Sequence, residues 1–192
     1  MDKDRDFEIF PPFEAFYLDG LRFCVESALK SAFRIEKTLQ KFDREQNEGL
    51  LSPLLNEAQN IALQAAGTSR FFWPAGKKYK QRGEFLRKVF EIEEESALKN
   101  RQLRNAMEHF DEYLDDYLAN VVCGIFLPSY VGRTLVDDGI PSHVFRAFYI
   151  DTAELKILGC SLPLMPLVNE LQKIYRLIEQ FDSQGRRFIN KK

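Results

Sequence analysis

A long apolar repeat near the start of the sequence restricts the fold more than any other feature. Between Pro12 and Phe42, apolar side chains recur at alternating steps of three and four residues, the spacing that places them on one face of an α-helix. The repeat is formed by Leu18, Leu21, Val25, Ala28, Ala32, Ile35, Leu39 and Phe42. The sequence therefore predicts one long helix whose apolar face is turned toward the core.

A second helix is predicted directly after a short acidic turn. Ser52 and Pro53 have the residue types of an N-cap and a first-turn residue, and the apolar pattern behind them ends near Gly67. The next stretch, TSRFFWPAGKKYKQRG, contains Pro74 and ends on Gly83, two residue types that typically interrupt helices. We therefore expect the first two helices to pair, and a loop to separate them from the next helix.

Helical signals resume near Phe85 and continue to about residue 119. The pattern leaves open whether segment 81–119 is one helix or is broken near Ser96, an available N-cap, and we favour a break or kink there. Two β-rich runs, VFRAFYI and LKILG, are typical of a hairpin. The last helix is expected to begin near Pro166. Its apolar face is formed by Leu167, Leu171, Ile174, Ile178 and Phe181.

These patterns predict a mainly α fold, a bundle of four to five helices with a small β-hairpin before the C-terminal helix. A chain of 192 residues is long enough for one domain with its own core. We therefore expect a single helical domain over residues 1–192. A short polar N-terminal segment, about 1–10, and a C-terminal tail, about 183–192, are expected at its ends.

Composition and charge exclude several classes of protein. A net charge of −2 provides no overall positive field, so a contact with nucleic acid would need a local basic patch. The start, MDKDRDFEIF, is acidic, and no apolar run approaches the length of a membrane span, so we expect a cytoplasmic protein that does not enter the membrane. Three cysteines far apart in the sequence indicate neither a disulfide framework nor a zinc site, and we expect small buried side chains.

The stretch LRNAMEHFDEYLDDYL, residues 103–118, contains one of the two histidines of the chain. Its apolar residues fall within one arc of a helical wheel, which predicts a core helix with a buried stripe. The stripe consists of Leu103, Met107, Phe110, Leu114, Tyr117 and Leu118. On the far side, Asn105, His109 and Asp116 lie within about 40° of one another, with Tyr113 at their edge.

Arg104 lies about 140° around the same wheel from His109, so the two side chains diverge on an ideal helix. Three arrangements would let both act on one phosphate. The helix is distorted near Arg104, the long arginine wraps around it, or a second copy of the chain brings its own motif across a two-fold axis. The third arrangement predicts a homodimer.

Arg104, Asn105 and His109, in the sequence RNAMEH, resemble the signature of the HEPN superfamily. That signature has a polar residue directly after an arginine, and a histidine separated from the arginine by four to six residues. The resemblance implies a compact, HEPN-like up-down helical bundle that usually dimerises, with the motifs of both chains lining a cleft at the interface. It also implies, as for many members, a metal-independent endoribonuclease of the toxin, abortive-infection or CRISPR-associated type.

On this resemblance, His109 corresponds to the catalytic histidine, Arg104 to the catalytic arginine and Asn105 to the polar position beside it. The histidine would take the proton of a ribose 2′-hydroxyl, and the arginine would grip two phosphate oxygens. The products would be a 2′,3′-cyclic phosphate and a 5′-hydroxyl, and no metal or cofactor is required. RNA would be the substrate, and an antitoxin or a nucleotidyltransferase would be a partner. The tyrosine that such a nucleotidyltransferase modifies is replaced here by Asp111.

A structural interpretation stays open beside the functional one. In it, Arg104 pairs with Glu108, His109 is a half-exposed surface residue, and the acidic residues form a solvated face. Two other classes of protein also stay open. One is a non-catalytic HEPN-like module that binds RNA, a nucleotide or a protein partner, and the other is a helical interaction protein without a site.

One segment, between residues 70 and 88, concentrates basic residues. It contains Arg70, Lys77, Lys78, Lys80, Arg82, Arg87 and Lys88, interleaved with Phe71, Phe72, Trp73 and Tyr79. Cations alternating with aromatic rings suit single-stranded RNA, and the expected contacts are Lys77, Lys78, Lys80 and Arg82. The alternative is a loop whose rings cap the end of the bundle while its lysines stay solvated.

No metal site is expected. The acidic residues around His109 are spread over more than one face of the helix, which does not suit a hard cation. The ferritin-like pattern of a glutamate three residues before a histidine is absent, because Ala106 and Ile140 occupy those places. The other histidine, His143, opens the predicted hairpin beside Pro141, and we expect it to be structural.

Overall fold

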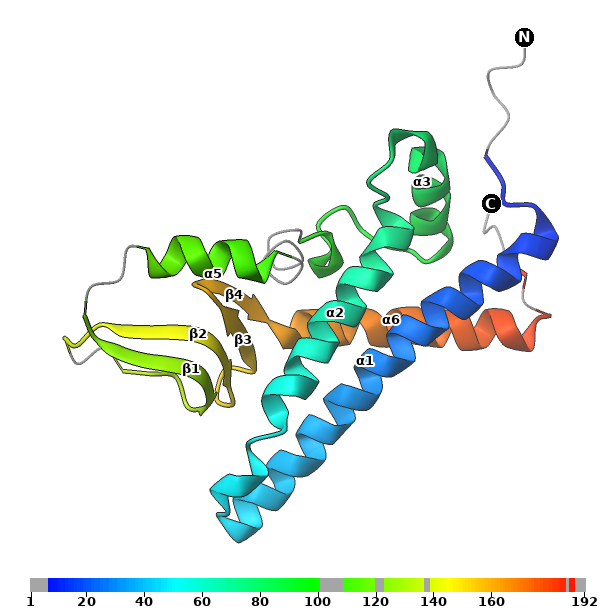
Figure 1. Cartoon of the computed structure of the whole chain (residues 1–192). Coiled ribbons are helices and arrows are strands. Elements are labelled where there is room, and N and C mark those ends of the chain that lie inside the picture. The colour runs from blue at the N-terminus through cyan, green and yellow to red at the C-terminus, as the bar shows by residue number, and fades with distance from the viewer. Residues whose placement is uncertain (1–6, 101–108, 120–122, 137–138, 186, 189–192) are drawn as a thin grey trace.

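A computed structural model describes residues 7–100, 109–119, 123–136, 139–185 and 187–188. Within them the fold is mainly helical, with a small sheet before the C-terminal helix (Figure 1). The helices are α1 (Pro11–Glu45), α2 (Leu54–Phe72), α3 (Lys80–Val89), α5 (Phe110–Leu118) and α6 (Leu164–Ser183). Short 3₁₀ turns cover Glu48–Leu50, Lys77–Tyr79 and Ala97–Lys99. In the described ranges, no helix has the length and apolar character needed to span a bilayer.

The predicted long helix is confirmed as α1. Prolines occupy its first turn, where a fixed φ suits the helix and a missing N–H costs no helical hydrogen bond. Much of its apolar repeat is buried, at Leu18, Leu21, Val25, Ala28 and Ile35, and the rest packs partly against the same core. Figure 1 shows α2 running back beside α1, and α6 crossing both helices.

A polar contact joins α1 and α2 along this packing. The Asn60 side-chain amide donates hydrogen bonds to the hydroxyl oxygens of Ser27 and Ser31, at 3.1 and 2.9 Å. Ser31 is buried, so its hydroxyl would lose hydrogen bonding to water without a partner on the neighbouring helix. The two helices therefore have a specific polar register as well as an apolar interface.

Two glycines that were expected to end a helix or mark a loop lie inside helices instead. α2 continues past Gly67 to Phe72, and Gly83 lies within α3. A Cβ at Gly67 would come within 3.1 Å of the Cys24 Sγ on α1, and a Cβ at Gly83 within 2.6 Å of the Phe72 carbonyl oxygen. Close approach between helices, rather than a chain break, explains both residues.

The break predicted near Ser96 is confirmed. α3 ends at Val89, and Glu91 adopts a left-handed φ of 53°, a conformation incompatible with a continuing right-handed helix. The Ser96 hydroxyl then accepts a hydrogen bond from the Leu98 N–H at 3.2 Å and caps a 3₁₀ turn. Segment 81–119 is therefore not one continuous helix.

The predicted hairpin is confirmed as part of a larger sheet. Its four strands, β1 (Ile125–Gly132), β2 (Ser142–Tyr149), β3 (Glu154–Ile157) and β4 (Cys160–Pro163), lie side by side in chain order. The pairs β2–β3 and β3–β4 are antiparallel. The sheet joins the helical core through side chains such as Phe148 of β2 and Leu155 of β3, both buried.

The first strand, β1, was not predicted. It pairs with β2 in parallel, with Ile125 opposite Ser142 and Gly132 opposite Tyr149. A parallel pair has no tight turn between its strands, so it leaves no local signal in the sequence. Pro128 is tolerated because β1 is an edge strand, where a missing N–H need not break a ladder.

The C-terminal helix is confirmed with the apolar face that the sequence predicts, since all five predicted residues are buried. The segment beyond α6 was expected to be a polar tail, yet part of it packs on the core. Phe188 is buried, with its ring centroid 5.6 Å from that of Phe181 and 5.9 Å from that of Phe90. The Glu14 carboxylate accepts hydrogen bonds from the Phe188 N–H and the Arg187 Nε, each at 2.9 Å.

We predict that Phe188→Ala lowers the free energy of unfolding by roughly 3 kcal/mol, because it leaves a cavity in the aromatic cluster. Phe16→Ala is the matched control, since Phe16 is 76% exposed on α1, and we expect it to change stability by less than about 0.5 kcal/mol. Urea unfolding measures both. Equal effects of the two variants would show that residue 188 does not belong to the core.

Candidate functional site

His109 immediately precedes α5 rather than lying inside a helix. Its backbone has φ −122° and ψ 35°, which is not helical, so the ideal wheel drawn from residue 103 to residue 118 does not run through it. The side chain is 56% exposed, and its Nδ1 lies 3.8 Å from a carboxylate oxygen of Glu112. The imidazole is therefore accessible to a ligand from solvent.

The other two residues of the predicted catalytic set, Arg104 and Asn105, lie outside the described residues, as do Leu103 and Met107 of the predicted stripe. The described part of the chain thus places one member of the set, His109. The three arrangements that would bring Arg104 and His109 to one phosphate stay predictions.

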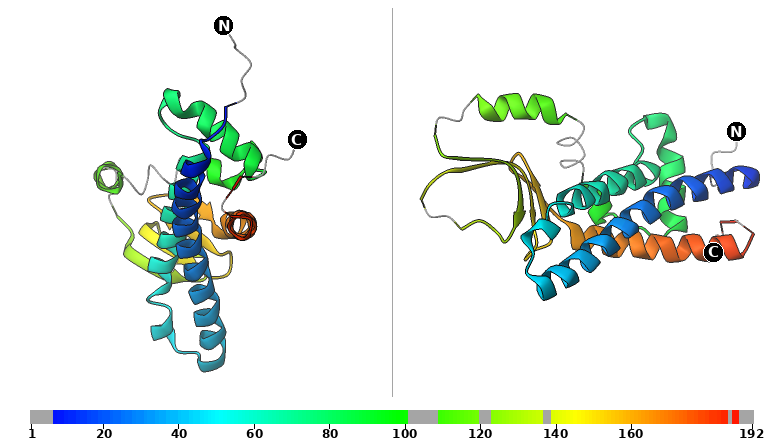
Figure 2. Two further views of the ribbon diagram at one scale, coloured as in Figure 1. Left: turned by 90° about the vertical axis from the view of Figure 1, so that its right-hand side faces the viewer. Right: turned by 60° about the horizontal axis from the view of Figure 1, so that its bottom comes forward.

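The prediction of a core helix with a buried stripe is wrong for α5. No residue of α5 is buried, and Phe110 and Leu118 are 50% and 47% exposed. Figures 1 and 2 show the reason, since α5 lies over the sheet and away from the packed helices α1, α2 and α6. Leu114 and Tyr117 are the members of the stripe that are partly covered.

The second histidine, His143, links α5 to the sheet. Its Nε2 lies 2.7 Å from the Cys123 carbonyl oxygen, which can only accept, so Nε2 carries the proton. In the neutral ring Nδ1 then accepts a hydrogen bond from the Tyr117 hydroxyl, 3.1 Å away. Both ring nitrogens are engaged within the fold, which is what a structural histidine requires.

The predicted basic contacts lie on α3 and the turn before it. Lys77, Lys78 and Lys80 are exposed, and the Lys78 Nζ lies 4.8 Å from the centroid of the Tyr79 ring. Arg82 is engaged within the fold, because its guanidinium donates to the Arg70 carbonyl oxygen at 3.5 Å and lies 5.8 Å from the Tyr17 ring. Figures 1 and 2 place α3 away from α5, so the described residues do not bring this basic surface to His109.

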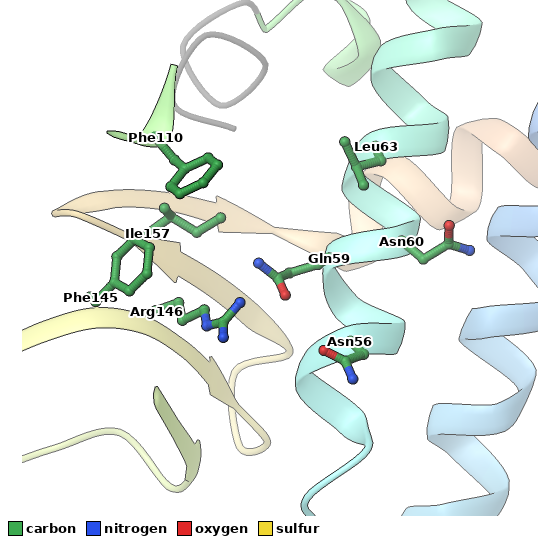
Figure 3. A pocket seen from close by; sticks show the side chains of 8 residues that line it. All are labelled: Asn56, Gln59, Asn60, Leu63, Phe110, Phe145, Arg146 and Ile157. Carbon is green, nitrogen blue, oxygen red and sulfur yellow. The ribbon is translucent and has the colours of Figure 1, made fainter. Parts of the chain in front are cut away.

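A cleft that the sequence did not predict opens beside the start of α5 (Figure 3). It has a volume of about 480 Å³, within the range of small-molecule sites. Its walls come from α2, the first residue of α5, and strands β2 and β3. The residues that line it are Asn56, Gln59, Asn60, Leu63, Phe110, Phe145, Arg146 and Ile157. Because Phe110 directly follows His109, the cleft begins next to the predicted catalytic histidine.

Of the described residues that line this cleft, Arg146 is the one that carries a charge. Its Nε is buried and has no hydrogen-bond partner within the described part of the chain. Its guanidinium carbon lies 5.5 Å from the centroid of the Phe145 ring, and Figure 3 shows the guanidinium facing Gln59 across the gap. The sequence carries a signal for this residue, an arginine in the middle of the apolar strand run VFRAFYI, but the run by itself predicts only a strand.

The cysteines are more exposed than expected. Cys123 is exposed, and Cys24 and Cys160 are partly buried. Burial raises the pKa of the Cys24 thiol above its ordinary value. Among the described residues, no three side chains of His, Cys, Asp or Glu are grouped as metal ligands would be.

Comparisons with protein-family models, with curated proteins and with solved structures found no match to this chain. The chemistry of His109 and of the cleft beside it is therefore the basis for assigning a function.

We predict that iodoacetamide at pH 8 alkylates Cys123 before Cys24. Thiolate is the reactive form, and a raised pKa leaves less of it at a given pH, while burial also restricts access to Cys24. Mass spectrometry of peptides over a time course measures the order. Alkylation of Cys24 at the same rate as Cys123 would contradict the burial of Cys24 between α1 and α2.

Proposed function

We propose that this chain is a HEPN-like, metal-independent endoribonuclease of the toxin or defence type. The observation that supports the proposal is the sequence RNAMEH at 104–109, which ends on a histidine whose side chain is 56% exposed at the start of α5. His109 would act as the general base on a ribose 2′-hydroxyl, because imidazole is the side chain that accepts protons near physiological pH. Arg104 would stabilise charge on the phosphate, and Asn105 would orient His109 or a phosphate oxygen.

The proposal also covers the type of helical bundle and the molecules that the chain binds. α1, α2, α3 and α6 would be helices of a HEPN-like up-down bundle. Two chains would form a homodimer in which the motifs meet across the two-fold axis, and RNA in the cytoplasm would be the substrate. Lys77, Lys78 and Lys80 would hold flanking RNA, since exposed lysines suit phosphate contacts. An antitoxin or a nucleotidyltransferase would regulate the enzyme, although Asp111 replaces the tyrosine that such a transferase modifies.

A second candidate function is a non-catalytic HEPN-like module that binds RNA, a nucleotide or a protein partner. One observation favours it. Among the described residues, the partner of the His109 ring is the carboxylate of Glu112 at 3.8 Å, which is beyond hydrogen-bond length, so nothing described holds the ring in a fixed orientation. A general base is normally oriented by such a partner.

We predict that purified protein cleaves mixed RNA in EDTA and that His109→Ala lowers the rate by about 10² to 10⁴, the contribution of a general base. Arg104→Ala should lower the rate by a comparable factor, because the negative charge on the phosphate in the transition state would lose the arginine that stabilises it. Arg176→Ala is the matched control, an exposed arginine on α6, and should leave the rate unchanged. Gel analysis of end-labelled RNA measures all four proteins.

Cleavage that persists unchanged in His109→Ala and Arg104→Ala would refute the catalytic assignment. If no RNA is cleaved by the native protein, the non-catalytic module is the better assignment.

A heterodimer tests whether the site is shared between chains. We predict that a dimer of one His109→Ala chain and one Arg104→Ala chain, isolated through two different tags, recovers about half of the native activity, because one of its two shared sites has both native residues. Each variant homodimer serves as the inactive control. A heterodimer as inactive as the homodimers would place both residues of a site on the same chain.

A further inference from the structure

The cleft lies between α2 on one side and β2, β3 and the first residue of α5 on the other (Figure 3). Its polar lining, here called the polar wall, consists of Arg146 on the strand side and of Asn56 and Gln59 across from it on α2. Its apolar lining, here called the apolar wall, consists of Phe110, Phe145 and Ile157 on the same side as Arg146, with Leu63 on α2. A ligand that is charged at one end and apolar at the other can therefore contact both kinds of side chain.

The polar wall has unused hydrogen-bonding capacity. The Arg146 Nε is shielded from water and has no partner on any described residue, which costs free energy unless a ligand or an ordered water supplies an acceptor. The side chains of Asn56 and Gln59 form no hydrogen bond with any described residue. Asn60 differs, because its amide nitrogen is already bound to Ser27 and Ser31 on α1. The unused groups therefore converge from α2 and β2 on one place.

The charge of the cleft selects an anion. Among the described residues that line it, Arg146 is the single charged one, and none is an acid. A guanidinium binds a phosphate or a carboxylate through paired, charge-assisted hydrogen bonds, and the Arg146 Nε has an N–H available for one of them. The ligand therefore has an anionic group that reaches Arg146.

The apolar wall selects a flat ring. The Phe110 and Phe145 rings have centroids 6.3 Å apart and planes inclined by 33°, and Phe110 is half-exposed. Such rings stack on a nucleobase, while carboxamides such as those of Asn56 and Gln59 can pair with the hydrogen-bonding edge of a base. An inorganic anion would leave this wall unused, and an aliphatic acid would leave the amides unused.

We propose that this cleft binds one nucleoside monophosphate unit, with its phosphate on Arg146 and its base against Phe110 and Phe145. The volume of about 480 Å³ is large enough for a single unit of this size. The unit is either a free nucleotide or the phosphorylated end of an RNA. The site is separate from the chemistry of His109 and needs no cleavage, so it does not depend on the proposed ribonuclease function. It gives nucleotide binding, one option of the second candidate function, a place in the fold and a ligand class.

Isothermal titration calorimetry at low salt tests the inference on the full chain. The probes are the four nucleoside 5′-monophosphates, adenosine, ribose 5-phosphate, inorganic phosphate, and an adenylate trimer with and without a 5′-phosphate. We expect at least one nucleotide to bind more than about tenfold tighter than its nucleoside and than inorganic phosphate, because both walls are then used. Preference for the phosphorylated trimer over the free nucleotide would identify an RNA end as the natural ligand.

Two variants connect binding to the cleft. Arg146→Gln should weaken nucleotide binding by about tenfold to a hundredfold through loss of the charge-assisted hydrogen bonds, and Phe110→Ala should weaken it without changing the affinity for inorganic phosphate. Arg146→Lys keeps the charge and should retain part of the affinity, which guards against a folding defect in Arg146→Gln. Arg176→Gln, on the outer face of α6, is the control and should bind as the native protein does.

Absence of binding by every nucleotide and both trimers would overturn the inference, as would binding that Arg146→Gln and Phe110→Ala leave unchanged. Equal affinity for inorganic phosphate and for the nucleotides would also overturn it, since the aromatic wall would then contribute nothing. Nucleotide binding without RNA cleavage would leave this inference standing and remove the ribonuclease. Cleavage without nucleotide binding would do the reverse.

Discussion

The packing of α2 against α1 is the contact on which the rest of the fold depends. Gly67 allows the two backbones to approach beside Cys24, and the Asn60 amide bonds to Ser27 and Ser31. A hydrogen-bonded group at an interface opposes sliding of the helices, because any other register would leave it without a partner. α6 crosses this pair, and the sheet and the chain end near Phe188 complete the same core.

The cleft follows from the way α2 is shared between two neighbours. One face of α2, with Ile61 and Ala65 buried, packs into the helical core. The opposite face presents Asn56, Gln59 and Leu63 to the sheet and to the start of α5 (Figure 3). α5 lies over the sheet and leaves a gap at this corner instead of filling it. The cleft beside His109 thus exists because α5 packs outside the helical core.

Much of the fold was predictable because its signals are local. The three-and-four repeat of α1 and α6, the cap at Ser96 and the β-rich run at 144–150 each specify an element within a few residues. The parallel strand β1 and the positions of Gly67 and Gly83 were not predictable in this way, since each depends on a segment elsewhere in the chain. The same limit applies to Arg146, whose neighbours Asn56 and Gln59 come from α2.

By itself, the sequence determined the helices with a continuous apolar face, and it determined that His109 belongs to an RNAMEH motif, because both are patterns of neighbouring residues. Only the tertiary structure decided what those residues face. The apolar residues of α5 looked like a core stripe, yet Phe110 lines a cleft, since the core was already closed by α1, α2 and α6. Periodicity reports which side chains share a face, but the surface that covers this face is supplied by distant parts of the chain.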